Sequence, residues 1–252
     1  MRRFLLLATC VVGAFGLAAA SPGSGEASAN GQRCGAGTNG SKGYAYAGHQ
    51  ARDVAHGVRA TITPTLKATV AAGHVAGWIG VGGPGQGANG ETSWLQVGIA
   101  SMPETPPMVY AEITRPGKDP VFVPLKEGVG VGERHRVAVL EMSGKANWWR
   151  VWLDGKAVTA PILLAHSTNR WRPIATAESW NGNRTVCNGF GFRFDGVAVA
   201  GSIGGSWRPF APGHTFLDRG FGVKRLSGTT GVPRTLAGSP PAPYAFEASS
   251  LS

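Results

Sequence analysis

The chain has 252 residues, a formal net charge of +10 and only 15% charged residues. Because 42% of it is hydrophobic, with 8 Trp and 10 Phe, the composition excludes a chain that is disordered throughout. Its 39 Gly and 17 Pro residues occur along the whole sequence, which excludes a coiled coil, and the presence of a single long apolar run excludes a polytopic membrane protein.

The first 20 residues have the features of a secretory signal peptide. Arg2 and Arg3 precede an apolar run over 4–20 that ends in three alanines, and a basic start, an apolar middle and small residues at the end are typical of export signals. We predict cleavage after residue 20, or as late as residue 29, and a secreted protein that has no membrane association after cleavage. An uncleaved anchor is the alternative.

Export changes how the cysteines are interpreted. Of the three, Cys10 leaves with the signal peptide, whereas Cys34 and Cys187 remain. Two cysteines in an oxidising compartment most simply pair, so we predict a Cys34–Cys187 disulfide, with two free thiols as the alternative. The six His residues are scattered without ligand spacing and there is no H-E-x-x-H motif, so neither a metal site nor a cofactor is predicted.

Composition divides the remaining chain into three parts. Residues 21–42 are rich in Gly, Ser and Ala and are predicted to form a flexible leader. From residue 43 to residue 213, short apolar runs alternate with Gly, Pro and Asn turns at a spacing of roughly 10–15 residues, which is typical of an all-β sandwich or barrel. Residues 214–252 are rich in Gly and Pro and are predicted to be a peripheral tail with an edge strand near 220–226.

The predicted strands follow one another with short turns between them. Asp154-Gly155 joins two of them and predicts a tight hairpin turn. No segment keeps a helical apolar period without a Gly or Pro breaker, so no long helix is expected. The predicted strands cover residues 58–63, 75–82, 93–99, 108–114, 120–126, 134–142, 148–154, 157–164, 172–180 and 190–199.

Strand alternation separates an apolar face from a face that carries aromatic and hydrogen-bonding groups. The pairs that share the second face are Trp94 with Gln96, Tyr110 with Glu112, and Glu178 with Trp180, and Trp78 also lies opposite its aliphatic neighbours. Aromatic rings give contact area and a few polar groups give orientation, so this pattern favours a concave groove for an extended ligand. The alternative is that the tryptophans lie under loops or in a second core layer.

Four motifs, taken in order, resemble those of the glutamic peptidases, or eqolisins. They are W-I-G-V-G-G at 78–83, W-L-Q-V-G at 94–98, V-Y-A-E-I-T-R-P at 109–116 and A-E-S-W at 177–180, followed by a Phe-rich strand at 190–200. Their order and spacing are similar to those of the family over residues 43–200. The resemblance implies a secreted acid endopeptidase, without a cofactor, on a concanavalin-like antiparallel β-sandwich of the jelly-roll type.

The resemblance also places a catalytic dyad at Gln96 and Glu178. It implies that ionised Glu178 takes a proton from a water and later protonates the leaving nitrogen, while the Gln96 amide donates to the developing oxyanion. An ordinary Glu pKa near ~4.3 then implies an acidic optimum. The residues that would bind the polypeptide substrate, Glu112 as a supporting acid and the others as groove walls, are Trp78, Trp94, Tyr110, Glu112 and Trp180.

Two other functions remain open at this stage. The first is a non-catalytic secreted module that binds carbohydrate or cell-wall glycan on the same sandwich, because a fold does not fix a function and positive charge favours anionic wall polymers. The second is a glycoside hydrolase that uses Glu112 and Glu178, which would need two carboxylates about 5–10 Å apart.

The Lys and Arg residues are scattered singly along the sequence, so no nucleic acid partner is expected. We also expect the protein to be a monomer.

Overall fold

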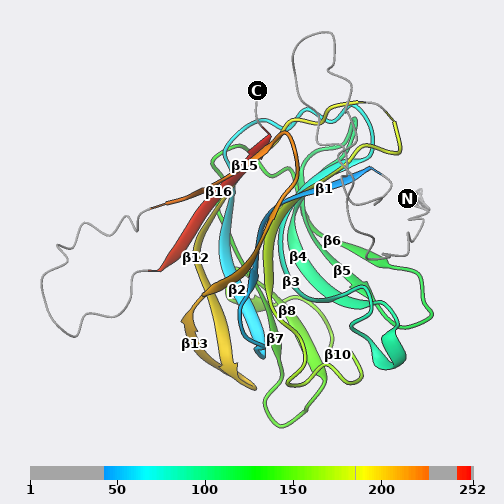
Figure 1. The fold of residues 1–252 in the computed structure, drawn as a ribbon, viewed down its shortest axis with the longest axis vertical. Helices are drawn as coiled ribbons and strands as arrows, with labels where there is room; N and C mark the ends of the chain where they lie inside the picture. The colour runs from blue at the N-terminus through cyan, green and yellow to red at the C-terminus, as the bar shows by residue number, and fades with distance from the viewer. Residues whose placement is uncertain (1–42, 185, 227–242, 251–252) are drawn as a thin grey trace, which may run out of the picture.

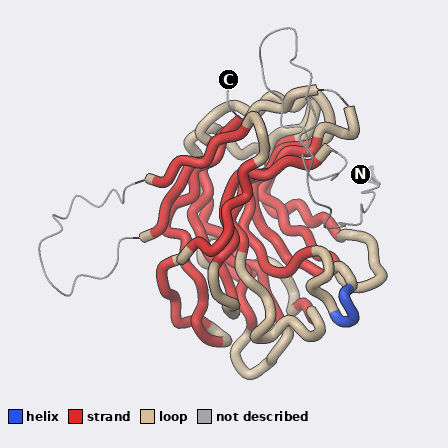
Figure 2. Tube along the Cα trace, in the orientation of Figure 1, coloured by secondary structure: helices blue, strands red, loops and turns tan. Residues whose placement is uncertain are grey.

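The computed structural model describes residues 43–184, 186–226 and 243–250, which form two packed antiparallel β-sheets (Figures 1 and 2). In spatial order, the seven-stranded sheet contains β14 (Pro212–Leu217), β1 (Tyr44–Ala51), β11 (Ile174–Trp180), β3 (His74–Gly83), β4 (Ser93–Ser101), β5 (Met108–Thr114) and β6 (Val121–Glu127). The predicted all-β antiparallel sandwich is therefore confirmed.

The nine-stranded sheet packs against the first and completes the sandwich. Its main path runs through β10 (Ile162–Leu163), β8 (Trp148–Leu153), β7 (His135–Glu141), β2 (Gly57–Pro64), β12 (Gly191–Ser202), β16 (Tyr244–Ser250) and β15 (Phe221–Arg225). Two further strands pair at its sides, β13 (Gly205–Pro209) with β12 and β9 (Lys156–Ala157) with β8. Within the described ranges, the one helical segment is a short 3-10 turn, η1 (Ala88–Gly90), and no helix is long and apolar enough to cross a membrane.

Most of the predicted strands occur close to their predicted bounds. The predicted hairpin is confirmed, because Asp154 and Gly155 both have positive φ, at 49° and 85°, and they connect β8 to β9. The predicted strand over 157–164 is wrong as a single element, since only β9 and β10 form there. Pro161 lies between them and has no N–H to donate to a strand ladder.

The core between the sheets is built as the alternation predicts. Leu95, Val97 and Ile99 of β4 are fully buried in it, so the side chains at alternate positions of β4 point to the other face of the sheet. Aromatic residues fill much of the remaining space, and the rings of Phe194 and Phe246 stack with centroids 4.5 Å apart.

The chain beyond residue 213 contributes strands to both sheets, although the sequence placed the end of the sandwich there. β14 pairs with β1 at the edge of the seven-stranded sheet, and β16 lies between β12 and β15 in the other sheet. Tyr244, Phe246 and Ala248 alternate along β16 and are buried in the core. The predicted edge strand near 220–226 is observed as β15.

The predicted signal peptide, the predicted leader at 21–42 and Cys34 all lie outside the described residues. The Cys34–Cys187 disulfide therefore stays a prediction.

Candidate active site

The seven-stranded sheet is hollowed on the face that points away from the core. The hollow has a volume of about 710 Å³ and is lined by residues of β1, β11, β3, β4, β5 and β14. Six of the seven residues predicted for the site line it, namely Trp78, Trp94, Gln96, Glu112, Glu178 and Trp180. The seventh, Tyr110, is not a wall as predicted but lies beneath it, only 2% exposed.

The strand order explains how residues far apart in sequence share this cavity. β3 lies between β11, which carries Glu178, and β4, which carries Gln96. The β3 residues in register with these two are small, Ala76 opposite Glu178 and Gly80 opposite Gln96. A Cβ atom on Gly80 would lie only 2.9 Å from Gln96 Cβ, so glycine at this position leaves room for the glutamine side chain.

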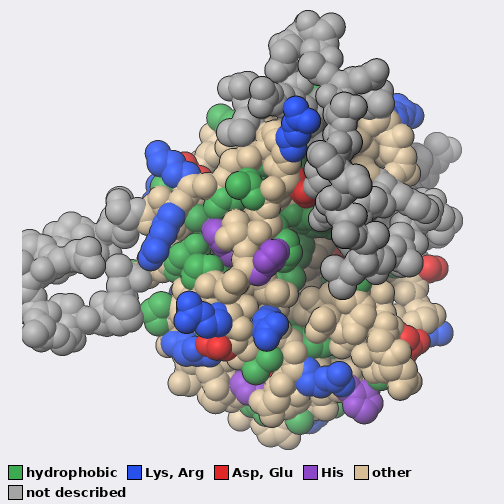
Figure 3. All heavy atoms as spheres, in the orientation of Figure 1, with side chains coloured by type: hydrophobic (Ala, Val, Ile, Leu, Met, Phe, Trp, Pro, Cys, Tyr) green, Lys and Arg blue, Asp and Glu red, His purple; other side chains and the backbone are tan. Residues whose placement is uncertain are grey.

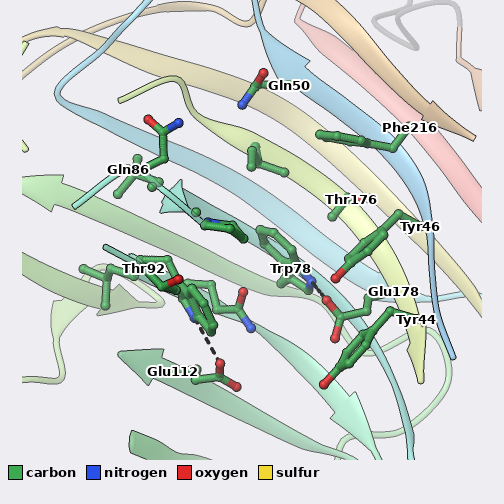
Figure 4. A pocket seen from close by; sticks show the side chains of 18 of the residues that line it. Tyr44, Tyr46, Gln50, Trp78, Gln86, Thr92, Glu112, Thr176, Glu178 and Phe216 are labelled. Atoms are coloured by element: carbon green, nitrogen blue, oxygen red, sulfur yellow. Dashed lines mark hydrogen bonds between the residues drawn. The ribbon is translucent and has the colours of Figure 1, made fainter. Parts of the chain in front are cut away.

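Glu178 is held by a donor on each carboxylate oxygen. Its Oε1 lies 2.8 Å from Nε2 of His74. Its Oε2 accepts a hydrogen bond of 3.2 Å from Nε1 of Trp78, which Figure 4 shows. The Glu178 side chain is 9% exposed. His74 in turn packs against Tyr44 and Trp180, with ring centroids 6.0 and 5.6 Å away. The carboxylate is therefore fixed in orientation at the cavity wall.

Gln96 is held by the buried phenol of Tyr110. Its Nε2 donates a 3.1 Å hydrogen bond to the Tyr110 Oη, and the Tyr110 ring stacks on Phe122 with centroids 4.9 Å apart. Burial raises the pKa of Tyr110 well above its usual value, and the negative charges of Glu178 and Glu112 raise it further. The phenol therefore stays neutral and keeps the amide in one orientation.

Glu112 lies in register with Gln96 on the neighbouring strand. Its Oε1 accepts a 3.0 Å hydrogen bond from Nε1 of Trp94 (Figure 4). Burial raises the pKa of Glu112 to about 7, and the negative charge of Glu178 adds to this, whereas the Trp94 hydrogen bond opposes it. One cavity thus holds two carboxyl groups, of which Glu112 is neutral in acid.

The raised pKa of Glu112 predicts a pH dependence of stability. Because the fold favours the protonated form, this stabilisation is complete below the ordinary value of 4.5 and is lost as the pH rises through about 7. The pKa difference corresponds to about 3 kcal/mol in the free energy of unfolding. Chemical denaturation at pH 5 and pH 8 should show this loss in the wild type, and a smaller loss in Glu112→Gln. Glu127→Gln, at an exposed position of β6, is the control, and an equal pH slope in all three proteins would contradict the assignment.

Sequence reasoning missed several residues that line the cavity, among them His74, Tyr44 and Tyr46. His74 precedes the predicted strand by one residue, yet it has the same alternation as Trp78, so a strand drawn from residue 74 would have included it. Tyr46 lies opposite Glu178 on β1, a strand that was not predicted. Among the residues that the structure describes, no group of three or more His, Cys, Asp or Glu side chains could hold a metal ion.

Comparison with known proteins defines how far the resemblance extends. No protein-family model and no curated protein matches the chain. Its structure is similar to that of Scytalido-glutamic peptidase bound to a peptide-based transition state analog, with a TM-score of 0.51 and 13% identity. It is also similar to SCP-B, a member of the Eqolisin family of peptidases, in complex with the tripeptide Ala-Ile-His, with a TM-score of 0.50 and 14% identity.

Each alignment covers 82% of this chain and 98% of the peptidase. The relation shown is one of fold. At 13–14% identity, the comparison shows that the chain shares its β-sandwich architecture with these peptidases. It does not assign roles to individual residues.

Proposed function

We propose that this chain is a secreted peptidase that hydrolyses peptide bonds of polypeptides with Gln96, Glu178 and an activated water. The observation that carries the proposal is that both side chains line one cavity on one face of the sheet, with both Glu178 oxygens oriented by donors. The fold shared with two peptidases that bind peptide ligands supports the same conclusion.

In this proposal Glu178 moves the proton. As a carboxylate it takes a proton from water, and the water oxygen forms a bond to the scissile carbonyl carbon while the carbonyl electrons move to oxygen. The resulting oxyanion accepts a hydrogen bond from the Gln96 amide. Protonated Glu178 then gives its proton to the amide nitrogen as the C–N bond breaks, and no acyl-enzyme forms.

The neighbouring residues have consistent roles in this chemistry. Tyr110 accepts one N–H of Gln96, which leaves the second N–H of the amide for the oxyanion. Glu112 is neutral below a pKa of about 7, so in acid it adds no negative charge where the oxyanion develops. Aromatic rings such as Tyr44 and Trp180, which stack with centroids 5.8 Å apart, give contact area for an extended polypeptide.

His74 is proposed to position Glu178, because its Nε2 lies 2.8 Å from Oε1 of the carboxylate. His74→Gln keeps a hydrogen-bond donor at this place, whereas the matched variant His74→Leu has none. We expect kcat of His74→Gln to stay within about tenfold of the wild type and kcat of His74→Leu to fall further, because a hydrogen bond to a charged group contributes about 1.5–3 kcal/mol. Equal kcat values in the two variants would contradict this role.

The proposed activity is tested by incubating the protein with denatured casein between pH 2 and pH 7 and identifying new termini by mass spectrometry. Cleavage that is greatest in acid is the expected result. A protein that cleaves nothing across this range is not a peptidase. If it instead bound cell-wall polysaccharide through the same cavity, the glycan-binding alternative would replace the proposal.

A further inference from the structure

The outer face of the nine-stranded sheet carries tryptophan and arginine side chains on neighbouring strands. The core-facing residues of these strands include Val58, Val139 and Val151, all fully buried, so the residues that alternate with them point outward. We call the outward residues the Arg/Trp face, which consists of Arg59, Arg136, Lys145, Trp148, Arg150, Trp152 and Trp207. These residues are exposed or partly exposed.

At the centre of this face, Arg59 lies between two small residues. Arg59 of β2 lies in register with Ala138 of β7 and Ala198 of β12, and Ala138 lies in register with Trp152. Trp152 on β8 and Trp207 on β13 are separated by four strand steps of about 4.8 Å each. Arg59 and the two alanines therefore lie on the strands between the two tryptophans.

The cations of the face are not neutralised by carboxylates. Among the described residues, no carboxylate lies within ion-pair distance of Arg59, Arg136 or Arg150. The Asp154 carboxylate accepts from the backbone N–H of Arg136 and contacts His135. Two other carboxylates near these strands pair with arginines outside the Arg/Trp face, Asp195 with Arg193 and Asp53 with Arg208.

The electrostatics of Arg59 show an excess of positive charge on this face. Burial lowers the pKa of Arg59 and the charge of Arg136 lowers it further, so the two guanidinium groups repel each other. Figure 3 shows several Lys and Arg side chains, with fewer Asp and Glu side chains between them, along the side of the molecule on which Figure 1 draws β12, β13 and β16.

We propose that the Arg/Trp face binds an anionic polysaccharide whose sugars carry carboxylate groups. Guanidinium groups match carboxylates with paired, charge-assisted hydrogen bonds. Single-stranded nucleic acid is disfavoured because a cation already covers one face of two of these rings, which leaves less ring surface for the base stacking that such binding needs. Arg59 lies 4.6 Å from the Trp207 ring centroid, and Lys145 lies 5.6 Å from that of Trp148.

Binding to this face does not depend on the proposed peptidase activity, because the cavity lies on the other sheet. The probe is polygalacturonate, with its fully methyl-esterified form as a neutral polymer of the same backbone. We expect the full chain to bind polygalacturonate, to bind it more weakly as salt is added, and to bind the ester poorly. Equal binding of both polymers, or binding of neither, would overturn the proposal.

Matched variants locate the site. The double variant Arg59→Gln/Arg136→Gln is expected to weaken binding about tenfold or more, because hydrogen bonds between charged groups are the strong ones. Trp207→Leu, which removes the ring beneath Arg59, should weaken it several-fold. The control Arg115→Gln/Lys118→Gln removes the same charge from the β5–β6 turn and should bind like the wild type.

Three outcomes would refute the site. The first is an equal loss of polygalacturonate binding in the Arg59/Arg136 and Arg115/Lys118 double variants, which would indicate that binding depends only on the net charge of the protein. The second is unchanged binding in the Arg59/Arg136 variant while its thermal unfolding matches the wild type. The third is tighter binding of oligo-dT or of anionic lipid vesicles than of polygalacturonate, which would assign the face to another partner.

Discussion

Glu178→Gln is expected to lower kcat on a polypeptide substrate by about a thousandfold, within the range found when a general base is removed. The amide cannot accept a proton from water, and it cannot later supply one to the leaving nitrogen. KM should change little, because the side chain keeps its size at the cavity wall. The measurement is steady-state cleavage of a fluorogenic peptide at the pH of greatest wild-type activity, with active protein quantified by its folded fraction.

Stability must be measured beside activity in this variant. Glu178 accepts from two donors, Trp78 Nε1 and, with its hydrogen on Nε2, His74, whereas glutamine offers one acceptor and brings an N–H₂ group against the other donor. A cost of about 1–3 kcal/mol in the free energy of unfolding is expected. Glu127→Gln, on exposed β6, should leave both activity and stability unchanged. If Glu178→Gln were folded and retained more than a tenth of wild-type kcat, Glu178 would not be the base.

The strands and the faces of the site followed from local patterns. Alternation in 93–99 and 108–114 was enough to place Gln96 and Glu112 on one face, and because β4 and β5 are consecutive strands their pairing is short-range. Strand β1 was not predicted because its side chains are small. It begins Tyr-Ala-Tyr-Ala-Gly and contains no run of aliphatic residues. The core strand β16 was missed because the Gly- and Pro-rich sequence before it dominates the composition of the tail.

The contacts that orient Glu178 could not be derived from such patterns. His74 and Trp78 lie 104 and 100 residues from it in sequence, and they meet it only because β3 pairs with β11 in one particular register. Pairing between distant strands depends on packing of the whole sandwich. The raised pKa of Glu112 is likewise a result of burial at the cavity wall, which the identity of the residue does not encode.

The role of Gln96 predicts a second large effect. Gln96→Ala should lower kcat by about 10²–10³-fold with KM nearly unchanged, because the lost hydrogen bond forms only as the oxyanion develops. Its free energy of unfolding should fall by no more than about 1–2 kcal/mol, since Tyr110 loses only a donor to its hydroxyl. Kinetics on the same fluorogenic peptide provide the measurement, with Glu127→Gln again as the control.

The double variant Gln96→Ala/Glu178→Gln separates joint action from independent action. Residues that serve one transition state are strongly non-additive, because a water that is no longer deprotonated does not generate the oxyanion that Gln96 would stabilise. The double variant should therefore be little slower than Glu178→Gln alone. If the fold-losses of kcat in the two single variants multiplied in the double variant, the two residues would act on separate steps. If Gln96→Ala had a raised KM and the wild-type kcat, Gln96 would be a substrate-binding residue.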